Sequence, residues 1–113
     1  MDKIKKYQHI LTQFLAEIAQ ESGLANMPAV ETEVLIDLQR NRFQALHLGW
    51  HGAKYIFAPI FHFDIKDGKI WFQCNNTERE VVDELMAMGV EKQDIVLGFL
   101  PPYARHLSGF AAA

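Results

Sequence analysis

The strongest signal of the fold is the segment FHFDIKDGKIWFQC, residues 61–74. Asp67 and Gly68 stand in its middle, between two runs in which apolar and polar residues alternate. Asp-Gly is typical of a two-residue hairpin loop of type I′, because both loop residues need a positive φ. Such a loop sets the pairs of the flanking strands: Ile65 with Ile70 and Phe63 with Phe72. The stretch therefore predicts an antiparallel hairpin with aromatic and aliphatic side chains on a common face.

Three strands are predicted before this loop, at residues 30–39, 43–50 and 54–65. Together with the strand after Gly68 they form a four-stranded antiparallel meander. Pro59 interrupts the third strand. Because proline donates no amide hydrogen, we expect a bulge at this residue or an unpaired strand edge.

The alternation of side chains assigns a face to each strand residue. Pairing Trp50 with Tyr55 or with Ala53 keeps Leu48 and Phe57 on the core side. Leu46 and Phe63 are expected on the same side, under the helices. The opposite face is expected to carry six apolar side chains: Leu35, Phe43, Ala45, Ile56, Ile60 and Trp71.

Helical periodicity flanks the sheet. Apolar residues recur every three or four positions over residues 3–21, which predicts a helix that buries one stripe. The sequence Thr77-Glu78-Arg79-Glu80 fits a capping box, and Gly89 is placed to end the helix that it starts. Residues 95–97 fit a short strand or a buried connector, and Pro101-Pro102 fits the start of a helical turn through residue 107. The predicted fold class is α+β, in two layers, with one domain over residues 1–113.

The composition of the chain makes several classes of function improbable. The 113 residues include 50% hydrophobic residues and carry a formal net charge of −3, which disfavours tight autonomous DNA binding. A single cysteine cannot form an internal disulfide. Residues 1–6 lead straight into the amphipathic pattern, without an apolar leader or a membrane-spanning run, so we expect a cytoplasmic protein that does not engage a membrane.

Candidate chemistry is sparse. His47 and His62 are expected on one face of adjacent strands, and Asp64 is near them, but a zinc site needs three or four ligands. Cys74 continues the alternation of Ile70 and Phe72 and fits a small buried apolar residue. We therefore expect no catalytic residue, no metal and no cofactor.

The sheet face away from the helices is the more informative feature. A monomer seldom leaves a large contiguous apolar patch in water, so this face is expected to bind a partner, a second copy or a ligand. The alternative is that residues 95–110 fold over it. Arg105 is a further candidate, because a planar guanidinium can clamp a carboxylate in a partner or within the fold. The predicted interface residues are Leu35, Phe43, Ile56, Ile60, Trp71 and Arg105.

Several short motifs, taken in order, resemble the XisI family. They are Gly49-Trp50, then residues 64–71 (DIKDGKIW), then Gly89-Val90, residues 94–99 (DIVLGF), Pro101-Pro102 and Arg105. The resemblance covers the chain from the first helix to about Phe110. The family takes its name from controlling factors of fdxN-element excision in cyanobacteria.

This resemblance implies an accessory role in site-specific excision of a DNA element during heterocyst differentiation, a DNA recombination event. It implies two partners, an XisH-like companion protein and a site-specific recombinase, and it implies no catalytic residues. We expect a non-enzymatic control factor that acts by protein association, as a homodimer. The alternatives are a nucleic-acid-binding regulatory factor and a small-molecule-binding domain; direct DNA contact is not favoured.

Overall fold

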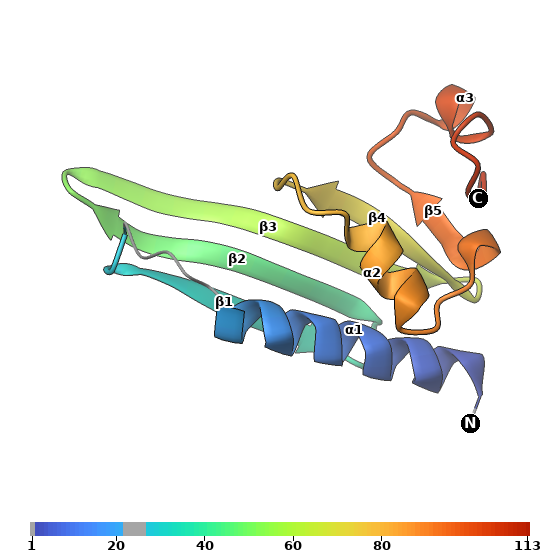
Figure 1. Ribbon diagram of the computed structural model, residues 1–113, viewed down its shortest axis with the longest axis horizontal. Coiled ribbons are helices and arrows are strands. Elements are labelled where there is room, and N and C mark those ends of the chain that lie inside the picture. The colour runs from blue at the N-terminus through green and yellow to red at the C-terminus, as the bar shows by residue number, and fades with distance from the viewer. Residues whose placement is uncertain (1, 22–26) are drawn as a thin grey trace.

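The computed structural model describes residues 2–21 and 27–113. It places two helices against one face of a twisted sheet (Figure 1). Helix α1 (Lys3–Glu21) precedes four strands, β1 (Val30–Asp37), β2 (Arg42–His51), β3 (Lys54–Lys66) and β4 (Lys69–Asn75). They are followed by α2 (Val81–Ala87), the 3-10 turn η1 (Lys92–Asp94), β5 (Ile95–Leu97) and α3 (Pro102–Arg105). The predicted α+β class is confirmed.

The core lies between α1, α2 and the sheet. The apolar stripe of α1 is buried over its whole length: Tyr7, Ile10, Leu11, Phe14, Leu15 and Ile18. These side chains meet buried residues of the central strands, and Phe14 packs edge-on against Phe61 and Phe63. No helix in the described ranges is long and apolar enough to cross a membrane.

The β3–β4 hairpin has the predicted register. Asp67 and Gly68 both have positive φ, 52° and 76°, as a type I′ turn requires. Ile65 pairs with Ile70 and Phe63 with Phe72, and all four side chains are buried. The rings of Phe63 and Phe72 stack with their centroids 4.7 Å apart.

The predicted irregularity at Pro59 is a bulge. Ala45 of β2 pairs with Phe61, whereas the next residue, Leu46, pairs with Pro59. Ile60 is therefore an extra residue in β3, and both Ile60 and Phe61 are buried. Pro59 needs no amide hydrogen here because the bulge interrupts the hydrogen-bond ladder.

A fifth strand extends the predicted meander. β5 pairs in parallel with β4, so that Ile95 lies beside Ile70 and Val96 beside Trp71. The amide of Gly98 donates to the Phe72 carbonyl at 2.8 Å, which continues the pairing past β5. The sheet order is β1-β2-β3-β4-β5. The predicted helical turn after Pro101-Pro102 is α3, which ends earlier than expected, at Arg105.

The predicted capping box does not form. Helix α2 begins at Val81, and no side chain caps its amino terminus. The Thr77 hydroxyl instead accepts a hydrogen bond from the Arg79 amide at 3.1 Å and donates to Asn75 Oδ1 at 2.7 Å. Thr77 thus shapes the turn before the helix, which is a second common use of a threonine hydroxyl. Gly89, with φ of 115°, does end the helix as predicted.

A buried polar pair ties the first helix to the turn before β5. The Tyr7 hydroxyl donates to Asp94 Oδ2 at 2.5 Å, and Lys3 Nζ lies 3.3 Å from the same oxygen. Both Tyr7 and Asp94 are buried. Burial and the hydrogen bond to Asp94 raise the pKa of Tyr7 to about 12. The fold therefore prefers the neutral phenol.

This pair predicts a loss of stability at alkaline pH. The contribution of Tyr7 is complete below its unfolded pKa of about 10 and is lost as pH rises from there towards about 12, a difference of roughly 1–3 kcal/mol. We expect Tyr7→Phe to lower the free energy of unfolding by about 1–3 kcal/mol near neutral pH, because Asp94 loses its donor. Denaturant unfolding near neutral pH and at about pH 11 should show a smaller alkaline loss in this variant than in wild type. The matched control is Tyr103→Phe, at an exposed tyrosine; equal alkaline losses in both variants would contradict the assignment.

Candidate functional site

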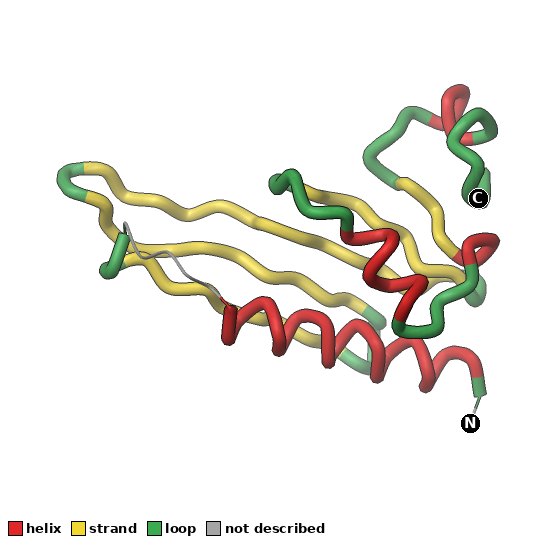
Figure 2. Tube along the Cα trace, in the orientation of Figure 1, coloured by secondary structure: helices red, strands yellow, loops and turns green. Residues whose placement is uncertain are grey.

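An exposed apolar surface covers the free end of the β2–β3 hairpin. This hairpin reaches well past α1 and β4 (Figures 1 and 2). Trp50 and Tyr55 lie opposite each other in the register, with ring centroids 5.1 Å apart, and Leu48 lies opposite Phe57. Trp50, Tyr55 and Phe57 are 56%, 49% and 68% exposed. We call these four residues the aromatic face.

The bulge at Ile60 creates the aromatic face. Side chains alternate with a period of two along a strand, so one extra residue moves every residue before it to the other side of the sheet. Phe61 is buried under the helices, and Tyr55 and Phe57 therefore point away from them. The prediction that Leu46, Leu48 and Phe57 lie on the helix side of the sheet is wrong for this reason, although Leu46, which pairs with Pro59, is buried. Counting the alternation again from Pro59 would have placed them correctly.

The predicted interface residues of the first three strands divide into three groups. Leu35 lies on the open sheet face and is 50% exposed. Phe43 and Ile60 are buried in the core, so their expected place on the open face is wrong. Phe43 pairs with Phe63, which fixes it on the helix side. Ile56 pairs with Gly49 on that side as well and is partly buried.

Trp71 does lie on the open face, but the C-terminal segment covers it. The Arg105 guanidinium lies 5.1 Å from the Trp71 ring centroid, and Lys66 Nζ lies 4.2 Å from it. Arg105 also donates through Nε to the Leu100 carbonyl at 3.0 Å and through Nη2 to the Gly98 carbonyl at 3.5 Å. The alternative that residues 95–110 fold over this face thus holds at the β4 end of the sheet. Arg105 clamps main-chain oxygens and an aromatic ring within the fold.

A polar cluster occupies the open face next to Trp71. Asp64 Oδ1 lies 2.9 Å from His62 Nε2 and 3.4 Å from Arg42 Nε. Gln73 Nε2 donates to the other carboxylate oxygen at 3.3 Å. The carboxylate therefore joins β2, β3 and β4 at this end of the sheet and is satisfied by neighbours.

The predicted histidine pair is not assembled. His62 pairs with Gln44 on the open face, whereas His47 pairs with Ala58 on the helix side, because the bulge lies between Ala58 and His62. No three His, Cys, Asp or Glu side chains of the described residues are placed to hold a metal ion.

Cys74 also lies on the opposite side of the sheet from the one predicted. A second bulge, at Gln73, lets His62 pair with Cys74 although Phe63 pairs with Phe72. The thiol therefore lies beside His62 in the register rather than beneath the helices. Partial burial raises the pKa of this thiol, which favours the protonated form over a nucleophilic thiolate.

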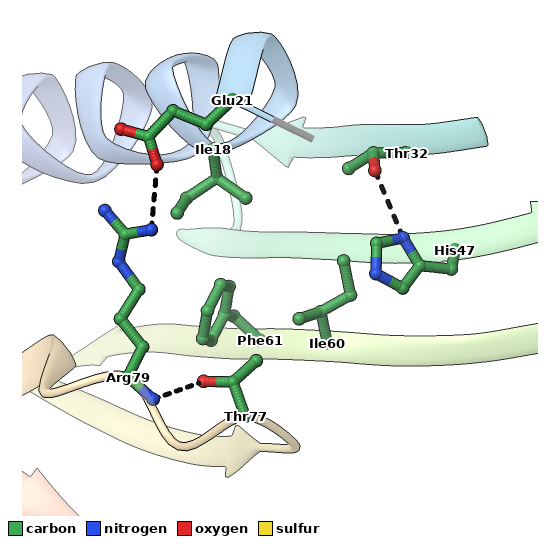
Figure 3. A pocket seen from close by; sticks show the side chains of 8 residues that line it. All are labelled: Ile18, Glu21, Thr32, His47, Ile60, Phe61, Thr77 and Arg79. Carbon is green, nitrogen blue, oxygen red and sulfur yellow. Dashed lines mark hydrogen bonds and ion pairs between the residues drawn. The ribbon is translucent and has the colours of Figure 1, made fainter. Parts of the chain in front are cut away.

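An open pocket of about 260 Å³ lies on the helix side, between the end of α1 and the strands (Figure 3). Its floor is apolar, with Ile18, Ile60 and Phe61, and its rim carries Glu21, Thr32, His47, Thr77 and Arg79. His47 Nδ1 lies 3.1 Å from the Thr32 hydroxyl, and burial lowers the pKa of this histidine.

The charged side chains at the rim of this pocket are already bound within the fold. Arg79 binds both oxygens of Glu84, at 2.6 and 2.7 Å, and one oxygen of Glu21 at 2.8 Å. The hydrogen bond to Glu84, and after it the hydrogen bond to Glu21, raise the pKa of Arg79. The alternative of a small-molecule-binding or catalytic domain would need a deep polar pocket that gathers several of His47, His62, Asp64 and Arg105, and only His47 of these lines this pocket. The geometry here is that of an ion-pair network that joins α1 to α2.

The sequence and the fold of this chain are both similar to those of known proteins. The family model described as XisI protein matches residues 1–112. A crystal structure of a XisI-like protein from Anabaena variabilis ATCC 29413 is 39% identical, with a TM-score of 0.90, and the match covers 97% of this chain and 99% of that one. The fdxN element excision controlling factor XisI from the same organism is 33% identical, with a TM-score of 0.83, over 99% and 100% of the two chains. No curated protein matches the chain.

Proposed function

Because this chain belongs to the XisI family, we propose that it is a non-catalytic control factor for the site-specific excision of a DNA element. It acts by binding other proteins. Its partners are an XisH-like companion protein and the site-specific recombinase that cuts the element. One solved relative is itself named as an fdxN element excision controlling factor, which supports this role.

The observation that carries the proposal is the aromatic face. Exposed Trp and Tyr side chains are typical of the centres of protein interfaces, where they bury large areas at a low cost in side-chain entropy. Here they project from a protruding hairpin. The polar candidates Asp64, Arg79 and Arg105 are instead occupied by contacts within the fold.

Co-purification tests this proposal. The tagged chain is co-expressed with its XisH-like companion, and in a second culture with the recombinase, and each lysate is treated with nuclease before capture. We expect capture of a partner at low and at high salt, because apolar contacts are not screened by ions. Phe57→Asp places a charge within the aromatic face and should reduce capture, whereas the control Leu107→Asp, at an exposed apolar residue outside this face, should not.

Other outcomes separate the alternatives. Absence of both partners from the wild-type eluate would contradict the proposal, as would unchanged capture by Phe57→Asp. Binding to element-end DNA with an affinity that falls steeply with salt would favour the nucleic-acid-binding alternative. A reporter plasmid that carries the element then shows whether the captured complex changes the frequency of excision.

A further inference from the structure

The basic residues of the chain are gathered at one end of the molecule. Nine of the eleven lysines and arginines lie in elements that meet at the end of the sheet opposite to the β2–β3 turn (Figure 1). They come from the start of α1, the β1–β2 and β3–β4 turns and the residues beside them, η1 and α3: Lys3, Lys5, Lys6, Arg40, Arg42, Lys66, Lys69, Lys92 and Arg105. We call the surface that these nine residues form the basic end.

Contacts between these elements show that the basic end is one surface. Lys3 Nζ lies 3.3 Å from Asp94 Oδ2, which joins the start of α1 to η1. A Cβ at Gly68 would lie 3.5 Å from Lys3 Cε, so α1 also begins beside the β3–β4 turn. The three lysines of the first helical turn therefore lie next to the basic residues of the sheet.

The two sheet turns and α3 meet at the same place. The Ile65 amide donates to the Asn41 carbonyl at 3.0 Å, which brings the β1–β2 turn beside the end of β3. The cationic groups of Lys66 and Arg105 both lie against the Trp71 ring, which adds α3 to this surface. Segments that are far apart in the sequence thus contribute to a single group of cations.

The rest of the molecule is acidic. The nine cations of the basic end are accompanied by six carboxylates, which leaves a formal charge of +3: Asp2, Asp37, Asp64, Asp67, Glu91 and Asp94. The remaining residues contain two cations, Lys54 and Arg79, against eight carboxylates, a formal charge of −6. These carboxylates belong to the second half of α1, to β1 and to the region of α2. The net charge of −3 therefore conceals a separation of charge along the molecule.

Several cations of the basic end are available to an external anion. Three of its carboxylates are already bound within the fold, Asp37 by Arg40, Asp64 by Arg42, and Asp94 by Lys3 and Tyr7. Among the described residues, no carboxylate pairs with Lys5, Lys6 or Lys69. Lys66 and Lys92 lie over aromatic rings, with Nζ 4.2 and 5.3 Å from the ring centroids. These five ammonium groups have no carboxylate that neutralises them.

The spread of the cations fits a long polyanion better than a small one. The hollows nearest to the basic end are each lined by one cation, Arg42, Lys6 or Lys5. The two shorter extents of the molecule, 33 and 24 Å, set the width of this end. One turn of duplex DNA is about 34 Å long and carries a charge at about every 1.7 Å of its axis. Phosphates of a duplex can therefore meet several of these cations at once, whereas a single phosphate group cannot.

We propose that the basic end contacts the phosphates of duplex DNA without reading its sequence, while the aromatic face binds the protein partner. The choice of DNA among polyanions rests on the proposed function, which places the chain at a DNA element. The two surfaces lie at opposite ends of the longest axis, which measures 43 Å (Figure 1). DNA repels the carboxylates of the acidic part, so the chain binds end-on and directs the aromatic face away from the duplex.

Fluorescence anisotropy of a labelled duplex, titrated with the purified chain, tests this contact. Non-specific contacts with phosphates have dissociation constants of about 10⁻⁴–10⁻⁶ M at physiological salt, so the titration starts at low salt. Contact with about four phosphates gives a slope of log K against log salt near −3.6, and a threefold rise in salt should lower the affinity about 50-fold. Element-end DNA and an unrelated duplex of the same length should bind equally, which distinguishes this contact from a factor that recognises the element ends.

A paired substitution locates the contact. Lys5→Gln together with Lys69→Gln removes two unpaired cations from separate elements of the basic end. This double variant should bind DNA at least about tenfold more weakly at low salt, with a slope that is smaller by about two. The matched control is Lys54→Gln, the same change at an exposed lysine beside the β2–β3 turn, and it should bind like wild type. Circular dichroism confirms that each variant is folded.

The same variants separate this contact from the proposed function. The double variant should capture the companion protein as wild type does, and Phe57→Asp should still bind DNA. Capture of the companion by a chain that does not bind DNA would overturn the DNA contact and leave the proposed function in place. DNA binding by a chain that captures neither partner would do the reverse.

Four results would overturn the DNA contact. They are no binding of wild type to a duplex at low salt, an affinity that does not change with salt, an equal loss of affinity in the double variant and in Lys54→Gln, and a preference of more than about tenfold for element-end DNA, because phosphate contacts carry no sequence information. Poly-glutamate serves as a competitor. If it displaced the duplex at an equal concentration of charge, an acidic protein segment would be the occupant instead, and this result would also overturn the inference.

Discussion

Replacing Phe63 with alanine is expected to lower the free energy of unfolding by about 3–5 kcal/mol, a large share of the stability of a domain of this size. Phe63 is fully buried. Its ring stacks on Phe72 at 4.7 Å and meets the edge of Phe14 at 6.0 Å, so it joins β3, β4 and α1. Alanine removes these contacts and leaves a cavity that neighbouring strands cannot close without losing their register.

Chemical denaturation with urea, followed by circular dichroism, measures this loss. Tyr103→Ala is the matched control, because Tyr103 is 79% exposed, and it should change the free energy of unfolding by less than about 0.5 kcal/mol. If Phe63→Ala cost no more than this control, the stacked phenylalanines would not be the centre of the core.

Gly49→Ala is expected to cost at least about 2 kcal/mol, because both the backbone angle and the available space oppose a side chain. Gly49 has a φ of 140°, and a Cβ there would lie 2.0 Å from the Ala29 carbonyl oxygen. This oxygen belongs to the backbone at the start of β1 and cannot turn away as a flexible side chain would. The variant must therefore separate the first residues of β1 from β2.

Gly52→Ala is the matched control in the same hairpin. Gly52 has a φ of 61°, but a Cβ there meets no heavy atom within 4 Å. Its cost is expected to be only about 1–2 kcal/mol, from the left-handed backbone alone. Thermal unfolding of both variants gives the comparison. A Gly49→Ala variant as stable as Gly52→Ala would show that β1 approaches Gly49 less closely than described.

The elements that the sequence predicted well are those with local causes. The Asp67-Gly68 turn sets its register through the φ preferences of two residues. The buried stripe of α1 follows from a period that is repeated within one helix. Gly89 ends α2 because glycine tolerates a left-handed backbone. None of these signals requires knowledge of a distant strand.

Pro59 shows where local reasoning stops. A bulge or an unpaired strand edge was predicted at this proline and a bulge is present, but the prediction left the residues before it on the faces that an uninterrupted strand would give them. Phe43 was therefore assigned to the open face and Phe57 to the core, and the structure reverses both. The candidate site was predicted as a face of the sheet; Leu35 and Trp71 do lie on that face, whereas the exposed Trp50, Tyr55 and Phe57 were not among its predicted residues.

The C-terminal segment depends on contacts that no local pattern specifies. Whether residues 95–97 form a strand is decided by the free edge of β4, which they join in parallel. Arg105 stands more than thirty positions after Trp71, and only the return of the chain past β5 brings them together. The motif order that resembles the XisI family includes both residues, but it does not say that one covers the other.

The sequence predicts helices α1 and α2, the register of the β3–β4 hairpin, an irregularity at Pro59 and the family, because turn chemistry, periodicity and motif order lie in neighbouring residues. Which side chains stay in water follows only from the way the strands, helices and C-terminal segment pack together. A single extra residue at Ile60 exchanges the two faces of a strand, and a returning segment covers one end of the sheet and leaves the other open. Exposure is a property of the whole packed chain, and for this reason the aromatic face became visible only in three dimensions.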